Sequence, residues 1–281
     1  MSGPITLFTT LKPVVGHDAV TQRNALESWL ALGSGRVRVI VMGGGLGVAE
    51  LCDELGVEHV EGVPVNSYGT PLLSGLYDAA EAQTERGGVL CYLNADIALL
   101  PGFVAAVGRV GRAKKRYLMV GRRTNVRVSA EATPDELEAL AKGAGSVDGP
   151  TAIDYFVTPK GAWGRLPDFA IGRTAWDNWM IYRARCLKMP VVDATACVLA
   201  IHQEHDYEHT DVEDGRGRKW VWQGPEARLN LTMAGGKRNL FTLMDATHRL
   251  TERGVETCER GTGLGGGVWS YRRSVSHPAV A

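Results

Sequence analysis

A short polar triplet interrupts one of the most apolar stretches of the sequence. Residues 89–103 read VLCYLNADIALLPGF, and Asn94 and Asp96 stand between the two hydrophobic runs. A bare carboxylate in such surroundings is costly, so we expect Asp96 at an opening of the fold. There it can hold a divalent cation that also bridges a diphosphate, while Asn94 bonds a ribose or a metal-bound water. An Asx turn at a strand end explains the triplet equally well.

A second acid stands beside aromatic residues in AIGRTAWDNWMIYRAR (170–185). One interpretation is a capping box, with Thr174 as N-cap and Asp177 three residues later. Asp is a poorer partner than Glu in that motif, and Trp176 beside it is typical of a sugar-binding platform. A helix N-terminus would also keep Asp177 ionised, as a general base requires. We therefore favour a functional role for this acid.

Histidines gather in IHQEHDYEH (201–209), where His202, His205 and His209 are spaced by three and four residues. This spacing permits a zinc site on one helical face. The preceding apolar run and the intervening acids favour a loop instead, with one or two functional histidines. We expect His202 to complete the coordination that Asp96 begins, whereas His205 and His209 can equally be surface residues.

Three further segments carry polar side chains at expected strand ends or helix starts. VGRRTNV (120–126) ends a strand on two arginines, of which Arg123 can bind phosphate or remain solvated. In IDYF, Asp154 either pairs with such an arginine or bonds a substrate hydroxyl, and Tyr155 follows it. NSYGTPLLSGL (66–76) joins Asn66 to a helix with Thr70 as its expected N-cap, a combination suited to holding part of a nucleotide.

The elements that must position these residues alternate between strand and helix. Short apolar runs such as ITLFTT (5–10) and RVRVIVMG (36–43) are followed by helical patterns. This order predicts an α/β fold with a mostly parallel sheet flanked by helices, in which ligands bind at the carboxyl ends of the strands. We predict one domain over residues 1–235. Residues 236–281 form a C-terminal extension, with a helix over 239–254 and a flexible tail that can act as a lid.

Composition excludes several classes of protein. The 281 residues carry 31 basic and 31 acidic side chains, so nothing indicates a nucleic-acid or membrane-surface binder. No apolar run approaches a membrane span, and five scattered cysteines with no secretory leader favour a cytoplasmic protein. The segment MGGGLG (42–47) departs from the dinucleotide-binding spacing, and no Walker A loop occurs.

With these residues assembled, the chain resembles glycosyltransferases of the GT-A (Rossmann-like) fold. The first strand ends in FTT, a later strand ends in a triplet like D-x-D, and a WDN helix follows. More closely, the segments CYLNADI, MVGRR, DYFVTPKGAW, FAIGRTAWDNWMI and IHQEHDY resemble a little-characterised group of family-two-like transferases. The resemblance extends over roughly residues 5 to 250.

The resemblance implies transfer of a hexosyl or deoxyhexosyl group from a nucleoside diphosphate sugar to an acceptor hydroxyl. It implies help from Mn²⁺ or Mg²⁺, an inverting mechanism, and an acceptor that is a glycan or a small molecule. The roles implied for individual residues are these: Thr9 and Thr10 at the nucleoside, Asn94 and Asp96 at ribose, diphosphate and metal, His202 as metal ligand, Asp177 as base, and Asp154, Arg123 and Trp176 in the sugar or acceptor pocket.

Two departures from the family pattern bear on these roles. Asn94 occupies the first position of the D-x-D triplet, which leaves Asp96 to hold the metal alone or weakly. The acid that normally follows the second strand and binds the nucleobase is replaced by GGG (43–45). A non-catalytic module that binds nucleotide sugars or carbohydrate is the main alternative. A sugar-1-phosphate nucleotidyltransferase is a weaker one, because the loop after the first strand has a single Lys and a single Gly.

Overall fold

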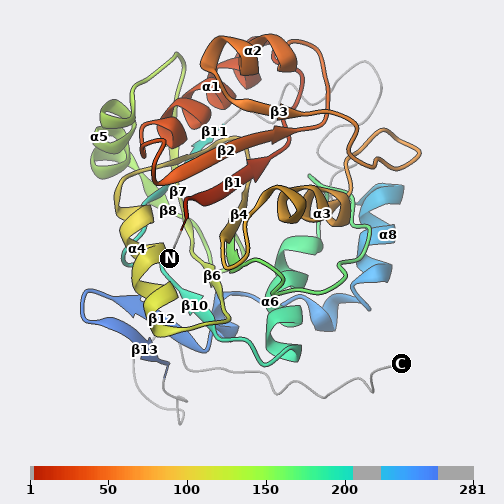
Figure 1. Cartoon of the computed structure of the whole chain (residues 1–281), viewed down its shortest axis with the longest axis vertical. Helices are drawn as coiled ribbons and strands as arrows, with labels where there is room; N and C mark the ends of the chain where they lie inside the picture. The colour runs from red at the N-terminus through yellow and green to blue at the C-terminus, as the bar shows by residue number, and fades with distance from the viewer. Residues whose placement is uncertain (1–2, 205–222, 259–281) are drawn as a thin grey trace.

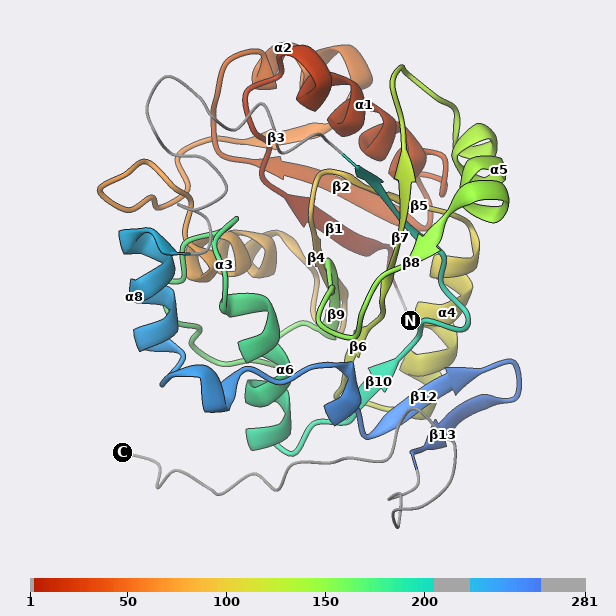
Figure 2. The ribbon, with the colours of Figure 1, turned by 180° about the vertical axis from the view of Figure 1, so that it is seen from behind.

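The computed structural model describes residues 3–204 and 223–258. Figures 1 and 2 show a central twisted sheet with helices on both faces. The helices are α1 (Gly16–Leu30), α2 (Val48–Leu55), α3 (Leu73–Gln83), α4 (Gly102–Ala113), α5 (Pro134–Ala144), α6 (Trp176–Cys186) and α8 (Pro225–Met233), with short 3₁₀ turns η2 (Lys237–Asn239) and η3 (Leu243–Asp245).

Within the described ranges, nine strands form the main sheet, in the order β13-β12-β10-β6-β9-β4-β1-β2-β3. Neighbouring strands are parallel except where β9 pairs with β4 and β6, and where β13 pairs with β12. The prediction of a mostly parallel α/β sheet is therefore confirmed. The strands are β1 (Ile5–Thr9), β2 (Val37–Met42), β3 (Glu58–Val60), β4 (Val89–Leu93), β6 (Leu118–Val120), β9 (Tyr155–Pro159), β10 (Val191–Asp193), β12 (His248–Thr251) and β13 (Gly254–Thr257).

A second, smaller sheet lies beside the carboxyl end of β4. In the described part of the chain it has the order β5-β11-β7-β8. Its strands are β5 (Ile97–Leu99), β7 (Arg123–Arg127), β8 (Ser146–Val147) and β11 (Ala200–Glu204). Residues 118–127 are divided between the two sheets as β6 and β7. The division falls at Gly121, where a Cβ would collide with the ring of Tyr155.

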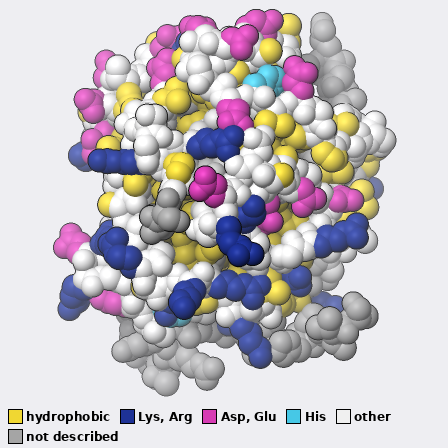
Figure 3. All heavy atoms as spheres, viewed as in Figure 1, with side chains coloured by type: hydrophobic (Ala, Val, Ile, Leu, Met, Phe, Trp, Pro, Cys, Tyr) yellow, Lys and Arg dark blue, Asp and Glu magenta, His cyan; other side chains and the backbone are white. Residues whose placement is uncertain are grey.

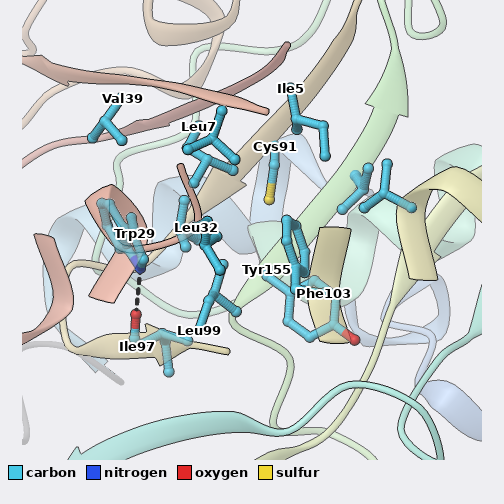
Figure 4. Close-up of a cluster of buried hydrophobic side chains, with 14 of the residues drawn as sticks. Ile5, Leu7, Trp29, Leu32, Val39, Cys91, Ile97, Leu99, Phe103 and Tyr155 are labelled. Carbon is cyan, nitrogen blue, oxygen red and sulfur yellow. Dashed lines mark hydrogen bonds between the residues drawn. The ribbon is translucent and has the colours of Figure 1, made fainter. Parts of the chain in front are cut away.

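Strand alternation separates two cores, one on each face of the main sheet. On one face, Leu7 and Cys91 pack under α1, α2 and α4, and Figure 4 shows part of this cluster, with the indole of Trp29 bonded to the backbone oxygen of Ile97 at 2.8 Å. On the other face, Phe8 and Tyr92 pack against α3 and α6. Both faces are covered, so β4 is apolar throughout, and its first polar residues come where it leaves the sheet.

Helix α5 begins with a reciprocal capping box between Thr133 and Glu136. The helix expected over 239–254 is wrong, because residues 248–249 pair instead with β10 and extend the main sheet. The hairpin β12–β13 therefore belongs to the sheet of the first 235 residues, and residues 259–281, which include the predicted tail, lie outside the described range.

Charge on the surface is mixed. In Figure 3, acidic side chains gather around α2 at the top of the view, whereas Lys and Arg are more frequent towards α4 and the β12–β13 hairpin. Neither sign covers this face, in keeping with the equal numbers of acids and bases. Among the described residues, none of the helices combines the length and apolar composition that a transmembrane span requires.

Candidate active site at the carboxyl end of β4

The Asn94-Ala95-Asp96 triplet forms the turn between β4 in the main sheet and β5 in the smaller one. The backbone N–H of Ile97 donates to the oxygen of Asn94 at 3.1 Å, and Gln203 N–H donates to the oxygen of Asp96 at 3.1 Å. The Asp96 side chain retains 20% of its exposure, whereas the strands on either side of it are buried. Asp96 thus lies at the strand end, where the sequence predicts an opening.

Asp96 and His202, which are 106 positions apart in the sequence, are brought together by the smaller sheet. His202 on β11 pairs in register with Ile97, and its Nε2 lies 3.6 Å from Asp96 Oδ2. One oxygen and one imidazole nitrogen at this separation can bind a single cation. No group of three or more His, Cys, Asp or Glu within the described ranges has a metal-binding arrangement. A cation at this pair would need its other ligands from water or a bound phosphate.

Asp154 lies directly beside the triplet, at the start of β9. The Asn94 amide donates to Asp154 Oδ1 at 2.7 Å, and Arg123 Nη1 donates to Oδ2 at 3.3 Å. Asp154 therefore pairs with one of the arginines after β6, one of the two arrangements expected from sequence. Its burial raises its pKa, Arg123 opposes that effect, and the charge of Asp96 raises the pKa further. Two acids thus share this end of the sheet.

Asp177 occupies the first turn of α6. Its Oδ1 accepts from the backbone N–H of Asn178 at 2.8 Å. Burial raises its pKa to about 7; the backbone bond to Asn178 lowers it, and the charge of Asp154 raises it. Against the expectation that the helix N-terminus keeps Asp177 ionised, its pKa is raised, because burial and a neighbouring acid outweigh the backbone hydrogen bonds. A carboxyl that titrates near neutrality can both take and give a proton.

The backbone before α6 also differs from the capping-box interpretation. Ala175, not Thr174, is the N-cap, and it has a φ of 90°, a conformation that is costly for a residue with a Cβ. The buried amide of Asn230 on α8 holds the preceding loop by donating to the oxygen of Thr174 at 3.2 Å and to that of Ala170 at 2.9 Å. Asn178 joins α6 to residue 241 through two further bonds. The start of α6 is therefore fixed from outside the helix.

Asn66 and Thr70 belong to a different cluster, centred on Glu226 of α8. Asn66 Nδ2 donates to Glu226 Oε1 at 2.7 Å, and Arg173 Nε donates to Oε2 at 2.8 Å. Glu226 is 1% exposed. Burial alone would raise its pKa, but hydrogen bonds from Thr70, Asn66 and Arg173 outweigh burial and lower it. Thr70 does not cap α3, which begins at Leu73, because residues 71 and 72 form bridges to other segments.

The remaining predicted residues divide between the site and the core. Thr10 is half-buried beyond β1, whereas the Thr9 hydroxyl is buried and donates to the oxygen of Leu93 at 2.7 Å, which joins the ends of β1 and β4. Trp176 is 4% exposed and packs edge-on against Tyr92.

Tyr155 is turned away from the polar cluster. It is fully buried on the opposite face of β9 from Asp154, beside Phe103 of α4, as Figure 4 shows. Successive side chains of a strand point to opposite faces, so Asp154 and Tyr155 cannot both face the cluster. This placement does not support contact between Tyr155 and a substrate. His205 and His209 lie outside the described residues.

Sequence reasoning missed three polar residues that organise these clusters: Asn125, Asp148 and Glu226. Asn125 lies on β7 and donates to Asp148 at 3.2 Å, and Asp148 also accepts from Arg123 Nε at 3.0 Å. Asn125 was visible in the segment VGRRTNV, two residues beyond the arginine. Asp148 and Glu226 stand in polar stretches, where a charged residue carries no distinguishing pattern.

No protein-family model and no curated protein sequence matches the chain. Among solved structures, glucosyl-3-phosphoglycerate synthase of Mycobacterium tuberculosis superimposes with a TM-score of 0.50 at 17% identity, over 84% of this chain and 82% of that one. The same enzyme in complex with Mn²⁺, uridine diphosphate and phosphoglyceric acid gives 0.51 at 17% identity, over 84% and 80%. With Mg²⁺ and uridine diphosphate it gives 0.50 at 16% identity, also over 84% and 80%.

The chain has a GT-A fold. The two sheets of this GT-A fold meet at the Asn94–Asp96 turn. Asp177 comes from α6, His202 from β11, and Asp154 from the residue directly before β9. The polar cluster thus gathers residues from both halves of the sequence at one end of β4.

Proposed function

We propose that the protein is a glycosyltransferase that moves a hexosyl or deoxyhexosyl group from a nucleoside diphosphate sugar to an acceptor hydroxyl. The observation that carries the proposal is that Asp96, His202 and Asp154 meet at the end of β4, and that the charge of Asp154 also acts on Asp177. A pair that can bind a cation lies there near a carboxyl that titrates close to neutral pH. The GT-A fold, which the chain shares with an enzyme solved with Mn²⁺ and uridine diphosphate, supports it.

In this proposal Asp96 and His202 hold Mn²⁺ or Mg²⁺ together with the donor diphosphate. The bound ion supplies charge that stabilises the departing diphosphate. Two protein ligands leave coordination positions for phosphate oxygens, the usual arrangement for Mg²⁺ in nucleotide sites. Asn94, the first position of the D-x-D-like triplet, is engaged with Asp154, so we assign it to orienting that carboxylate and the donor ribose rather than to the ion.

Asp177 is the proposed base that removes the proton from the acceptor hydroxyl as it attacks the anomeric carbon, which gives inversion. Its raised pKa matches the task, because a base that titrates near the working pH is both available and strong enough. Arg123 is proposed to bind an anionic group of donor or acceptor, with its orientation set by Asp154 and Asp148. Thr10 is proposed to contact the nucleotide, and the buried Thr9 and Trp176 to support the wall of the pocket. Asn66 and Thr70, which the sequence placed at the nucleotide, are engaged with Glu226 and are not assigned to it.

A thermal-shift screen of nucleoside diphosphate sugars, with and without Mn²⁺, tests the proposal. We expect a donor that stabilises the protein only with the metal, and that is slowly hydrolysed without acceptor. NMR of the product anomer then decides between inversion and retention. Metal-dependent binding with no hydrolysis and no transfer to any acceptor would instead identify a non-catalytic binding module.

A further inference from the structure

Asn125 is the cross-strand neighbour of His202. The two residues are paired in the parallel register of β7 and β11, and His202 Nδ1 lies 3.0 Å from Asn125 Oδ1. His202 is 3% exposed. A buried imidazole that uses one ring nitrogen towards a fixed partner has its proton position set by that partner.

The orientation of the Asn125 amide is fixed from its other side by Asp148. Asp148 Oδ2 accepts from Asn125 Nδ2 at 3.2 Å and from Arg123 Nε at 3.0 Å, while Oδ1 accepts from the N–H of Gly149 at 2.7 Å. A carboxylate can only accept from these three donors, so the Asn125 amide nitrogen must face Asp148. Its oxygen therefore faces His202, and an oxygen at that place requires a proton on Nδ1.

We propose that Asn125, held by Asp148, is a positioning residue that keeps the His202 proton on Nδ1 and so presents Nε2, with Asp96, to a divalent cation. The inference rests on the proposed function, because it assumes the ion at Asp96 and His202. Histidines that bind metals commonly donate their second ring N–H to a fixed acceptor, and loss of that acceptor typically weakens metal binding by about 10–100-fold. Here the acceptor is an amide, and a carboxylate fixes its direction.

The test determines by NMR which ring nitrogen of His202 carries the proton, and it does not require glycosyl transfer. Protein labelled with ¹⁵N at histidine is measured free of metal at pH 8, and the His202→Gln variant assigns the signal. Mn²⁺ affinity is then measured with UDP present, for the wild-type protein and for Asn125→Leu, Asn125→Asp and Glu204→Gln. Glu204→Gln is the matched control, because Glu204 forms an exposed ion pair with Arg127 of β7 on the same pair of strands.

For the wild-type protein we expect a proton on Nδ1, and loss of the Nε2 signal when Mn²⁺ binds. Asn125→Leu should mix the two tautomers and weaken Mn²⁺ binding about 10–100-fold. Asn125→Asp, which still offers an acceptor oxygen, should retain the Nδ1 proton and bind Mn²⁺ more tightly than Asn125→Leu. Glu204→Gln should match the wild type in both measurements.

A proton on Nε2 in the metal-free wild-type protein would overturn the inference, as would unchanged Mn²⁺ affinity in Asn125→Leu. If Asn125→Leu fails to fold, the wild-type tautomer and its response to Mn²⁺ still decide. Failure of the wild-type protein to bind Mn²⁺ would overturn it as well. A wild-type protein with the expected tautomer and Mn²⁺ binding that transfers no sugar would contradict the proposed function and leave the inference standing.

Discussion

Two buried acids in this fold have nearly the same hydrogen-bond partners and opposite electrostatics. Asp154 accepts from the amide of Asn94 and from Arg123, and Glu226 accepts from the amide of Asn66 and from Arg173. The pKa of Asp154 is raised, whereas that of Glu226 is lowered.

The difference comes from what else surrounds each carboxylate. Glu226 receives a further hydrogen bond from Thr70, so its neighbours favour the charged form. Asp154 has Asp96 nearby, which opposes its charge. When an acid is surrounded only by hydrogen-bond donors, it stays charged and holds neighbouring segments together. Glu226 in this way links α8 to the loops before α3 and α6. Several acids gathered at one strand end are costly to maintain without a cation or substrate, which is typical of functional sites.

The largest effect is expected on transfer in the Asp177→Asn variant. Loss of a general base typically costs about 10²–10⁴-fold in rate. The measurement is kcat with the donor found by the screen, and donor affinity by calorimetry should stay unchanged. Asp168→Asn, which removes an exposed acid bonded to Ser74, serves as the charge-matched control. Retention of most of the transfer rate would refute the base assignment and favour a retaining mechanism.

Glu226→Gln is expected to have the largest effect on stability. A glutamine must turn one N–H towards Asn66 or Arg173, so a donor would face a donor in a buried joint. Breaking a buried pair of this kind costs about 3–5 kcal/mol, and the loss is measured as a fall in the unfolding free energy in urea. A loss no larger than that of Asp168→Asn would show that this joint adds little to the fold.

Asp154→Asn should behave differently from Glu226→Gln. Asp154→Asn must also turn an amide N–H towards Asn94 or Arg123, but it removes a charge that burial and Asp96 disfavour. The two effects oppose each other, so the unfolding free energy should fall by about 1 kcal/mol or less, clearly less than in Glu226→Gln. Transfer should fall by about 10–100-fold, because Arg123 loses one of the two carboxylates that orient its guanidinium and keeps only Asp148. Equal destabilisation by the two variants would erase the distinction between the two acids.

The pH dependence of stability should have opposite signs at Asp177 and Glu226. The folded pKa of Asp177 is raised to about 7, so its charge penalises the folded state increasingly as pH rises from about 4 to 7. Asp177→Asn should therefore gain stability over the wild type across that range. We expect about 1–2 kcal/mol, because Asp177 is only half-buried and solvent weakens the effect. The folded pKa of Glu226 is lowered, so its contribution is complete above about pH 5 and is lost on further acidification. Urea unfolding of Asp177→Asn and Glu226→Gln at several pH values measures these effects. If the stability difference from the wild type changed with pH in the same direction in both variants, the opposite pKa shifts would be contradicted.

The smallest effect is expected for Tyr155→Phe. The Tyr155 hydroxyl is buried and has no hydrogen-bond partner within the described ranges. Its removal should leave transfer unchanged and raise the unfolding free energy by up to about 1 kcal/mol. A marked loss of transfer would place Tyr155 in the site after all, although it lies on the opposite face of β9 from Asp154.

Local sequence determined the strands, most of the helices and the position of Asp96 at a strand end. A run that is apolar throughout must lie between two covered faces, so β4 was predictable, as was the exposure of Asp96 where that run is interrupted. β2 was predictable from the apolar run that follows Arg38. The capping box of α5 was equally local, because its two members are three residues apart.

Tertiary structure alone decided which residues meet and in what charge state. Asn125 reaches His202, and Asp148 reaches Asn125, only through the pairing of β7 with β11 and the turn after β8. The pKa of Asp177 depends on burial and on Asp154, 23 residues away in the sequence, so its place at a helix N-terminus did not predict that this pKa is raised. The segment 248–251 became a strand because β10 offered it an unpaired edge. The spacing of apolar residues reflects only interactions within a segment. Strand pairing, burial and the charge state of a side chain depend on segments that are distant in the sequence.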